Sequence, residues 1–236
     1  CSRTNMYIDF ARLRPKIGNT IPGEKLKLTA EFSLHTADNN SMFNVVSTCS
    51  YGNTIDSVKA KTVWEEHENK IRADGLTAEE LNIQKRNFYL LDAHRYFKQD
   101  SFDFIIQSVG VYENKDIVKK GCEVLHKKLT DLVHSIDSDM VLIKLSETSM
   151  DFSYDIVLEN EDYTLGKVLE YILYEKFFID QKLLTFCGFK KIHPHDTDSI
   201  IRVAYAQTTD KNLVAQNLRE VSIIAAEVFT KLYKMF

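Results

Sequence analysis

The stretch that decides the fold is residues 152–173, which read Phe152-Ser-Tyr-Asp-Ile-Val-Leu-Glu-Asn-Glu-Asp-Tyr-Thr-Leu-Gly-Lys-Val-Leu-Glu-Tyr-Ile-Leu173. Apolar side chains occupy every second position of the first part, which predicts a half-buried strand: Phe152, Tyr154, Ile156 and Leu158. Apolar side chains then recur at spacings of three and four, which predicts an amphipathic helix: Leu165, Val168, Leu169, Ile172 and Leu173. An acidic turn separates the two, and we expect the Thr164 hydroxyl to cap the helix. The residues therefore predict a strand that leads directly into a helix, which packs back on that strand or on a partner.

The acidic turn and the helix start resemble a known family. The segment from Leu158 to Leu169 is similar to the helix-start signature of the small alpha-like subunit of multisubunit RNA polymerases, which is the eleventh subunit of polymerase II and has a counterpart in archaea. The family usually has His where Tyr163 stands and Asn where Lys167 stands. The similarity continues through an aromatic-rich strand that ends in His-Pro at residue 194, a further strand, and a long closing helix. The motif residues that carry the resemblance are Glu161, Asp162, Thr164, Leu165 and Gly166.

A second strand and helix lie upstream. Phe102, Phe104 and Ile106 alternate with polar residues, Ser-Val-Gly follows, and residues 117–136 predict a long helix. Its apolar residues alternate spacings of four and three, which is the seam of a helix that packs lengthwise on another helix: Val118, Cys122, Leu125, Leu129, Leu132 and Ile136. This segment resembles the strand, turn and dimerisation helix that close the larger alpha-like subunit, which is the third subunit of polymerase II and likewise has an archaeal counterpart.

The final helix, predicted over about Lys211–Met235, carries a second seam of the same kind. Two such seams in one chain can bury each other, so the chain resembles a fusion of the two alpha-like subunits, similar to what large cytoplasmic DNA viruses carry. We expect the joining segment, residues 137–151, to be partly ordered because it contains an apolar run. The dimerisation interface is predicted to contain Leu125, Leu129, Leu132, Leu165, Leu169, Ile172, Val221 and Val228.

The N-terminal part of the chain fits the resemblance more loosely. Residues 1–60 read as β structure, with strands expected at 6–10 and 26–32, and the second of these resembles a strand of the larger subunit's insertion domain. Residues 62–100 predict exposed helices, with a capping box formed by Thr77 and Glu80. The family's upstream strand and helix do not occur before Cys1, so we expect them to precede this chain or to come from another polypeptide.

The resemblance implies a fold class and a division of the chain. The class is α+β: the alpha-like RNA polymerase dimerisation fold with a mostly β insertion domain. Residues 1–100 would be the insertion domain of the larger subunit, and residues 101–150 the C-terminal part of its dimerisation domain with a linker. Residues 151–236 would be the small alpha-like subunit domain.

Composition narrows the classes of function. The formal net charge is −4, and Lys and Arg are scattered among acids, so we expect little direct nucleic-acid contact. The four cysteines, Cys1, Cys49, Cys122 and Cys187, have no CxxC spacing and suggest neither a cysteine zinc site nor a disulfide framework. No apolar run is long enough for a membrane span, and we expect no membrane association.

Two clusters are candidates for chemical sites. Cys187 with His193 is a thiol-hydrolase candidate, but Cys187 lies in an apolar run where a buried structural thiol is the plainer interpretation. Glu159, Glu161 and Asp162 are candidate Mg²⁺ ligands, but acids also favour a helix start through the helix dipole. We therefore expect no catalytic residue, no metal site and no cofactor in this chain.

The resemblance implies a role in assembly and no chemistry of the chain's own. The expected function is a non-catalytic platform of a DNA-directed RNA polymerase, docking the two large catalytic subunits, which carry the nucleotidyl transfer, and a small zinc-bearing subunit. A viral source would place it in the virion and host cytoplasm, and a cellular source in the nucleus. The alternative from another class is a stand-alone homodimeric binding module unrelated to transcription.

Overall fold

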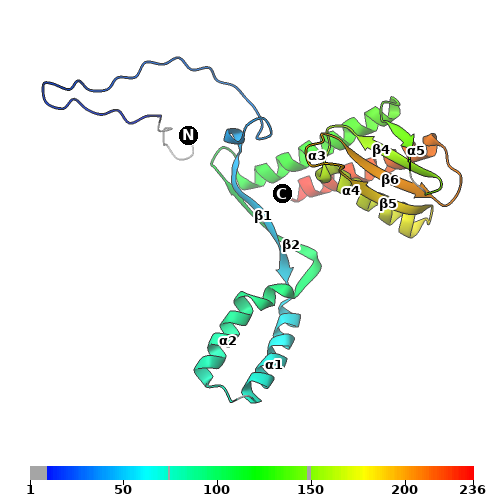
Figure 1. Ribbon diagram of the computed structural model, residues 1–236, viewed down its shortest axis with the longest axis horizontal. Coiled ribbons are helices and arrows are strands. Elements are labelled where there is room, and N and C mark those ends of the chain that lie inside the picture. Colours follow the sequence, from blue (N-terminus) through cyan, green and yellow to red (C-terminus); the bar gives the residue numbers. More distant parts are fainter. Residues whose placement is uncertain (1–9, 74, 148–149) are drawn as a thin grey trace. The chain divides into compact units, whose positions relative to one another are not determined.

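The computed structural model describes residues 10–73, 75–147 and 150–236, and the chain divides into two compact units, Cys1–Asn114 and Lys115–Phe236 (Figure 1). Each unit contains both helices and a small sheet, so the predicted α+β class is confirmed at that coarse level. A two-stranded sheet belongs to the first unit and a four-stranded sheet to the second.

The first unit is built on a two-stranded antiparallel ribbon and a helical hairpin. The ribbon pairs β1 (Val46–Ile55) with β2 (Phe97–Ser108), and the hairpin consists of α1 (Ser57–Ala73) and α2 (Ala78–Leu90). Short 3₁₀ turns, Ser41–Phe43 and Asp92–Arg95, precede β1 and β2. The predicted capping box at the start of α2 is present, and the small core of the hairpin contains Ala60, Trp64, Phe88 and Ala93.

The strand predicted at residues 26–32 is wrong. These residues have no strand conformation in the structure, and Leu26, Leu28 and Phe32 are exposed. Alternation of apolar side chains indicates what a strand would bury, but a strand also needs a neighbour for its backbone N–H and C=O groups, and no described strand lies beside this segment. The strand predicted at 6–10 falls mainly on residues 1–9, which lie outside the described residues.

The second unit packs three helices on a four-stranded antiparallel sheet. The sheet order is β3 (Ile143–Leu145), β4 (Ser153–Leu158), β6 (Ser199–Tyr205) and β5 (Leu184–Lys190). The helices are α3 (Asn114–Asp137), α4 (Tyr163–Leu173) and α5 (Lys211–Met235), and a π-helical turn, Tyr174–Asp180, continues α4 (Figure 1). The joining segment, residues 137–151, was expected to be partly ordered, and this is confirmed because it contains β3, which pairs with β4.

One continuous core fills the second unit. Residues of β4 and β6 that share a face, among them Ile156 and its cross-strand partner Ile201, contact the apolar faces of all three helices. Leu129 of α3 and Leu169 of α4 are completely buried in this core. The prediction that the strand-and-helix segment ending near residue 136 and the one beginning near residue 152 share one hydrophobic interior is therefore confirmed for the helix, α3, but not for the strand before it.

Two details at the borders of that core differ from the sequence prediction. The strand before α3, β2, pairs with β1 and contributes no residue to the core of the second unit. Phe152, expected on the buried face of β4, has a φ of 50° and is exposed, so β4 begins one residue later at Ser153. A left-handed residue cannot continue the pleat of a strand, and it turns the Phe152 side chain away from the buried row.

Candidate functional site at the junction of α3 and the acidic turn

The acidic turn that links β4 to α4 is held by short-range hydrogen bonds. Asn160 takes a left-handed conformation, with φ of 54°, and its N–H donates to Asp198 Oδ1 at 2.9 Å. The Asp162 carboxylate accepts the Thr164 N–H at 2.9 Å and caps α4. The cap expected from Thr164 is therefore wrong: an ionised carboxylate at the helix N-terminus is the stronger acceptor. The backbone N–H of Thr164 also lowers the pKa of Asp162.

Gly166 lets α4 approach β5 closely. A Cβ at this position would have three atoms of the Phe189 ring within 2.8 Å, so no larger residue fits without moving the ring or the helix. The Phe189 ring also contacts Tyr163 edge-to-face, with ring centroids 5.1 Å apart. Close packing against Phe189 therefore explains why a glycine stands at position 166. Its backbone conformation does not require glycine, because it is helical.

The open edge of β5 is bonded to α4 by Glu170. Its Oε1 accepts the Phe189 N–H at 3.0 Å, and its Oε2 accepts an ion-paired hydrogen bond from Lys167. Because β5 is the last strand of its sheet, Phe189 N–H would otherwise be one of the free donors of an edge strand. The lysine that departs from the family pattern, Lys167, therefore has a local structural partner.

Three ion pairs join α3 and the residues just after it to later parts of the unit. Lys128 Nζ lies 2.9 Å from Glu161 Oε2, so the motif acid reaches directly to α3. Arg219 of α5 binds Asp137 through two nitrogens, at 2.7 and 3.3 Å, and lowers its pKa. A third pair joins Lys211 to Asp139 at 2.8 Å. All three are partly exposed, so each adds little to stability and chiefly fixes how α3 is aligned.

Most of the predicted interface residues lie in the core. Four are buried: Leu129, Leu165, Leu169 and Val221. Leu132 and Ile172 are half-buried against the same cluster, and Leu125 is half-buried on α3. Val228 is 44% exposed, which contradicts its place in an interior seam. After the fully buried Ala225, the residues of α5 that pack on the core are Ala226 and Phe229, because the helix repeat of 3.6 places the residue four positions after Ala225 on the buried side. A dimerisation role for these residues stays a prediction.

A largely buried ion pair lies on the face of the sheet opposite to the one that carries the core pair Ile156 and Ile201, as set by the alternation along β4 and β6. Asp155 on β4 is directly opposite Arg202 on β6, and the guanidinium donates two hydrogen bonds to the carboxylate at 2.6 and 2.7 Å. These hydrogen bonds hold the pKa of Asp155 below its usual range despite burial. This pair was not predicted from the sequence, because it depends on the register of β4 against β6.

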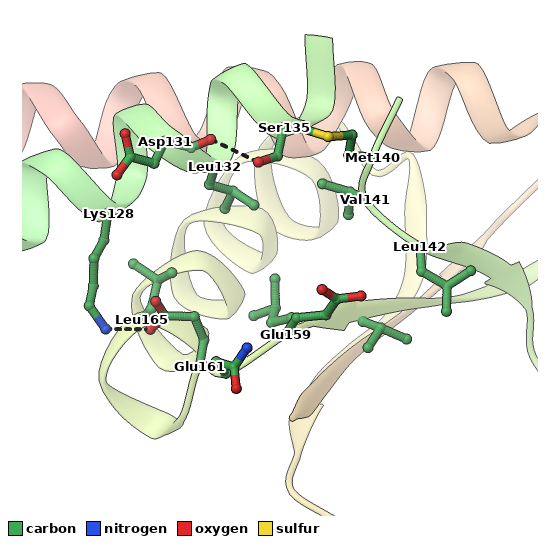
Figure 2. Close-up of a pocket in the computed structure, with 13 residues that line it drawn as sticks. Lys128, Asp131, Leu132, Ser135, Met140, Val141, Leu142, Glu159, Glu161 and Leu165 are labelled. Atoms are coloured by element: carbon green, nitrogen blue, oxygen red, sulfur yellow. Dashed lines mark hydrogen bonds and ion pairs between the residues drawn. The ribbon is translucent and has the colours of Figure 1, made fainter. Parts of the chain in front are cut away.

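An open cavity of about 380 Å³ lies between α3 and the acidic turn (Figure 2). One wall is α3, with Lys128, Asp131 and Leu132; a second wall is residues 140–142. The third is the end of β4 and the turn, and the buried Leu165 of α4 closes the base. The cavity thus combines the motif acid Glu161 with apolar and charged groups of α3, and it was not predicted from the sequence.

The candidate chemical residues are arranged as structural groups. Burial raises the pKa of the Cys187 thiol to about 12, and the nearby Glu170 carboxylate acts in the same direction. His193 Nδ1 accepts the His195 N–H at 3.1 Å, and the His193 N–H donates to Asp196, so these residues form a turn after β5. A thiol of such high pKa is a poor nucleophile at neutral pH.

Comparison with known proteins gives no relative: no family model matches the chain, and no curated protein matches it. Within residues 10–73, 75–147 and 150–236, no group of three or more His, Cys, Asp or Glu side chains is arranged to hold a metal ion. In the same ranges, every helix is too short or too polar to cross a membrane.

Proposed function

We propose that the chain is a non-catalytic assembly platform of a DNA-directed RNA polymerase, which docks the two large catalytic subunits and a small zinc-bearing subunit. The observation that supports this function is the single core of the second unit. Leu129 and Ile136 of α3, in the segment that resembles the larger alpha-like subunit, are buried with Leu169 and Val221 from the segment that resembles the small one. Two resembling segments that bury each other are what a fused alpha-like pair requires.

Covalent fusion suits a platform on physical grounds. Linking two interacting segments replaces a bimolecular encounter by an effective concentration of roughly millimolar or more. The segment between α3 and β4 is short and partly ordered, with β3 paired to β4, so little chain entropy separates the halves. The ion pairs Lys128–Glu161 and Arg219–Asp137 then favour one alignment of α3 on the sheet and α5. A platform needs such a single alignment to present its outer surfaces reproducibly.

Catalysis is assigned to the large subunits. The thiol-hydrolase candidate, Cys187, has a pKa raised to about 12 and its thiol donates to the Glu170 carbonyl oxygen at 3.7 Å. That arrangement favours the neutral thiol and argues against the thiol-hydrolase alternative. For a viral source, the proposed compartments are the virion and host cytoplasm, and for a cellular source the nucleus.

Co-purification from the cells or virions that contain the chain tests this proposal. A tagged wild-type chain should recover two very large polypeptides and promoter-independent RNA synthesis. Leu129→Asp and Leu169→Asp each bury an unpaired charge and should abolish that recovery, whereas Val124→Asp, on an exposed position of α3, should retain it. Recovery of the chain alone as a homodimer would contradict the proposal and support a stand-alone binding module. Wild-type polymerase assembly by both core variants would contradict the interface assignment.

A further inference from the structure

We propose that the cavity between α3 and the acidic turn binds a basic side chain, arginine or lysine, that a partner protein presents. The cavity has a volume of about 380 Å³, within the range of sites that hold small groups. Its surroundings combine an apolar base with an acidic mouth. We call it the acidic pocket.

The base of the acidic pocket suits the methylene stem of a long basic side chain. Leu158 and Leu165 are fully buried beneath it, and Leu132 and Val157 are half-buried along its sides. Lysine and arginine bury their stems along apolar surface while the charged end stays near polar groups. A small hydrated metal ion would gain nothing from these apolar walls.

The charges around the mouth leave a surplus of carboxylates. Three acids and one lysine line the acidic pocket, and Lys128 is already paired with Glu161 at 2.9 Å. The carboxylates of Asp131, on α3, and Glu159, at the end of β4, make no hydrogen bond or ion pair with any residue that the structure describes. Figure 2 shows the Ser135 hydroxyl bonded to the Asp131 backbone carbonyl, with the Asp131 carboxylate directed to the outer side of α3. The unpaired Glu159 carboxylate and the negative charge of Asp131 nearby favour a cationic occupant, and a guanidinium offers Glu159 charge-assisted hydrogen bonds.

The surface beside the mouth indicates that the occupant belongs to a protein. Met140 is 68% exposed and Leu142 is 51% exposed, and both also line the acidic pocket. These exposed apolar side chains can pack against apolar residues that flank the basic residue of a docking chain. Methionine and arginine are both enriched at protein interfaces, where an anchored side chain in a recess carries much of the affinity.

The acidic pocket is also formed before any partner arrives. The Asn160 N–H bond to Asp198 and the Asp162 cap fix the turn, and β4 is bonded to strands on both sides. A preformed site loses little conformational entropy on binding. A homodimeric binding module would carry the same pocket, so this site is separate from the proposed function.

Titration of the ¹⁵N-labelled full chain with a blocked tripeptide, acetyl-Leu-Arg-Leu-amide, tests the site. We expect saturable amide shifts confined to residues 128–135, 140–142 and 157–161, with a low-millimolar dissociation constant or tighter. The matched peptide with neutral citrulline in place of arginine should bind at least about tenfold more weakly, because it keeps the shape and removes the charge.

Variants at the mouth supply the second arm. The double variant Asp131→Asn with Glu159→Gln should lower arginine-peptide affinity at least about tenfold, while Glu123→Gln, elsewhere on α3, should not change it. Asp131 and Glu159 are exposed, so the circular dichroism spectrum and unfolding midpoint should match wild type. Equal binding of the citrulline peptide, unchanged affinity in the double variant, shifts outside the pocket, or no saturable binding would each overturn the proposal.

Discussion

Replacement of Gly166 by alanine tests how closely α4 approaches β5. The new methyl carbon would have three Phe189 ring atoms within 2.8 Å, whereas carbon atoms pack best at about 3.5–4.0 Å. The nearest ring atom would lie at 2.0 Å, so the ring or the helix must move by roughly 1.5 Å, and overpacking of this kind costs about 1–3 kcal/mol. Alanine is intrinsically better than glycine in a helix by about 1 kcal/mol. We expect Gly166→Ala to lower the free energy of unfolding by about 1 kcal/mol.

Removing the ring should reverse the sign of that effect. In a Phe189→Ala background the space is empty, so Gly166→Ala should raise the free energy of unfolding by up to about 1 kcal/mol. The double-mutant cycle then gives a coupling of about 2 kcal/mol, measured by urea unfolding of the four proteins followed by circular dichroism. If Gly166→Ala has the same effect in both backgrounds, close packing against Phe189 is not the reason for the motif glycine.

Two further changes address the buried ion pair and the thiol. Asp155→Asn leaves the half-buried Arg202 without its charged partner and should lower the free energy of unfolding at pH 7 by about 1.5–3 kcal/mol. Because the pKa of Asp155 is lowered in the folded state, this stabilisation is complete above the unfolded pKa of about 3.9 and is lost as pH falls through the folded pKa. The gap between wild type and Asp155→Asn, measured by urea unfolding, should therefore narrow only below about pH 4; a gap that narrows between pH 7 and 5 would contradict the assignment. Burial raises the pKa of the Cys187 thiol to about 12, so iodoacetamide at pH 8 should alkylate the exposed Cys49 at least about ten times faster, as read by peptide mass spectrometry. Comparable alkylation rates would support Cys187 as a nucleophile. If Cys187 is a structural thiol, Cys187→Ser should leave function unchanged.

The parts of the fold that were predictable from the sequence are long segments in which apolar residues recur at a regular spacing. The period of α5 predicted its bounds, Lys211–Met235, because a helix of that length buries a stripe that is visible in its residue pattern. The switch from period two to 3.6 likewise located β4 and α4. The strand expected at 26–32 failed because a strand depends on a partner elsewhere in space, and alternation carries no information about that partner.

Features of the candidate site were predictable only where residues of a single segment determine them. The acidic turn before Thr-Leu-Gly marked the helix start, although the capping group is Asp162 and not Thr164. The role of Gly166 depends on Phe189, which lies on another element, and the Asp155–Arg202 pair depends on the register of β4 on β6. The acidic pocket requires α3 and the turn to be placed together, which periodicity alone does not do.

Cleavage of the chain between β3 and β4 tests the shared interior most directly. A specific protease site inserted between residues 146 and 152 would separate α3 and β3 from the rest of the second unit, with no core residue changed. Native mass spectrometry of the cleaved protein at micromolar concentration should find the two fragments as a one-to-one complex, held by the buried faces around Leu129 and Leu169. Fragments that separate under those conditions, with the C-terminal one still folded, would show that the two segments have independent cores.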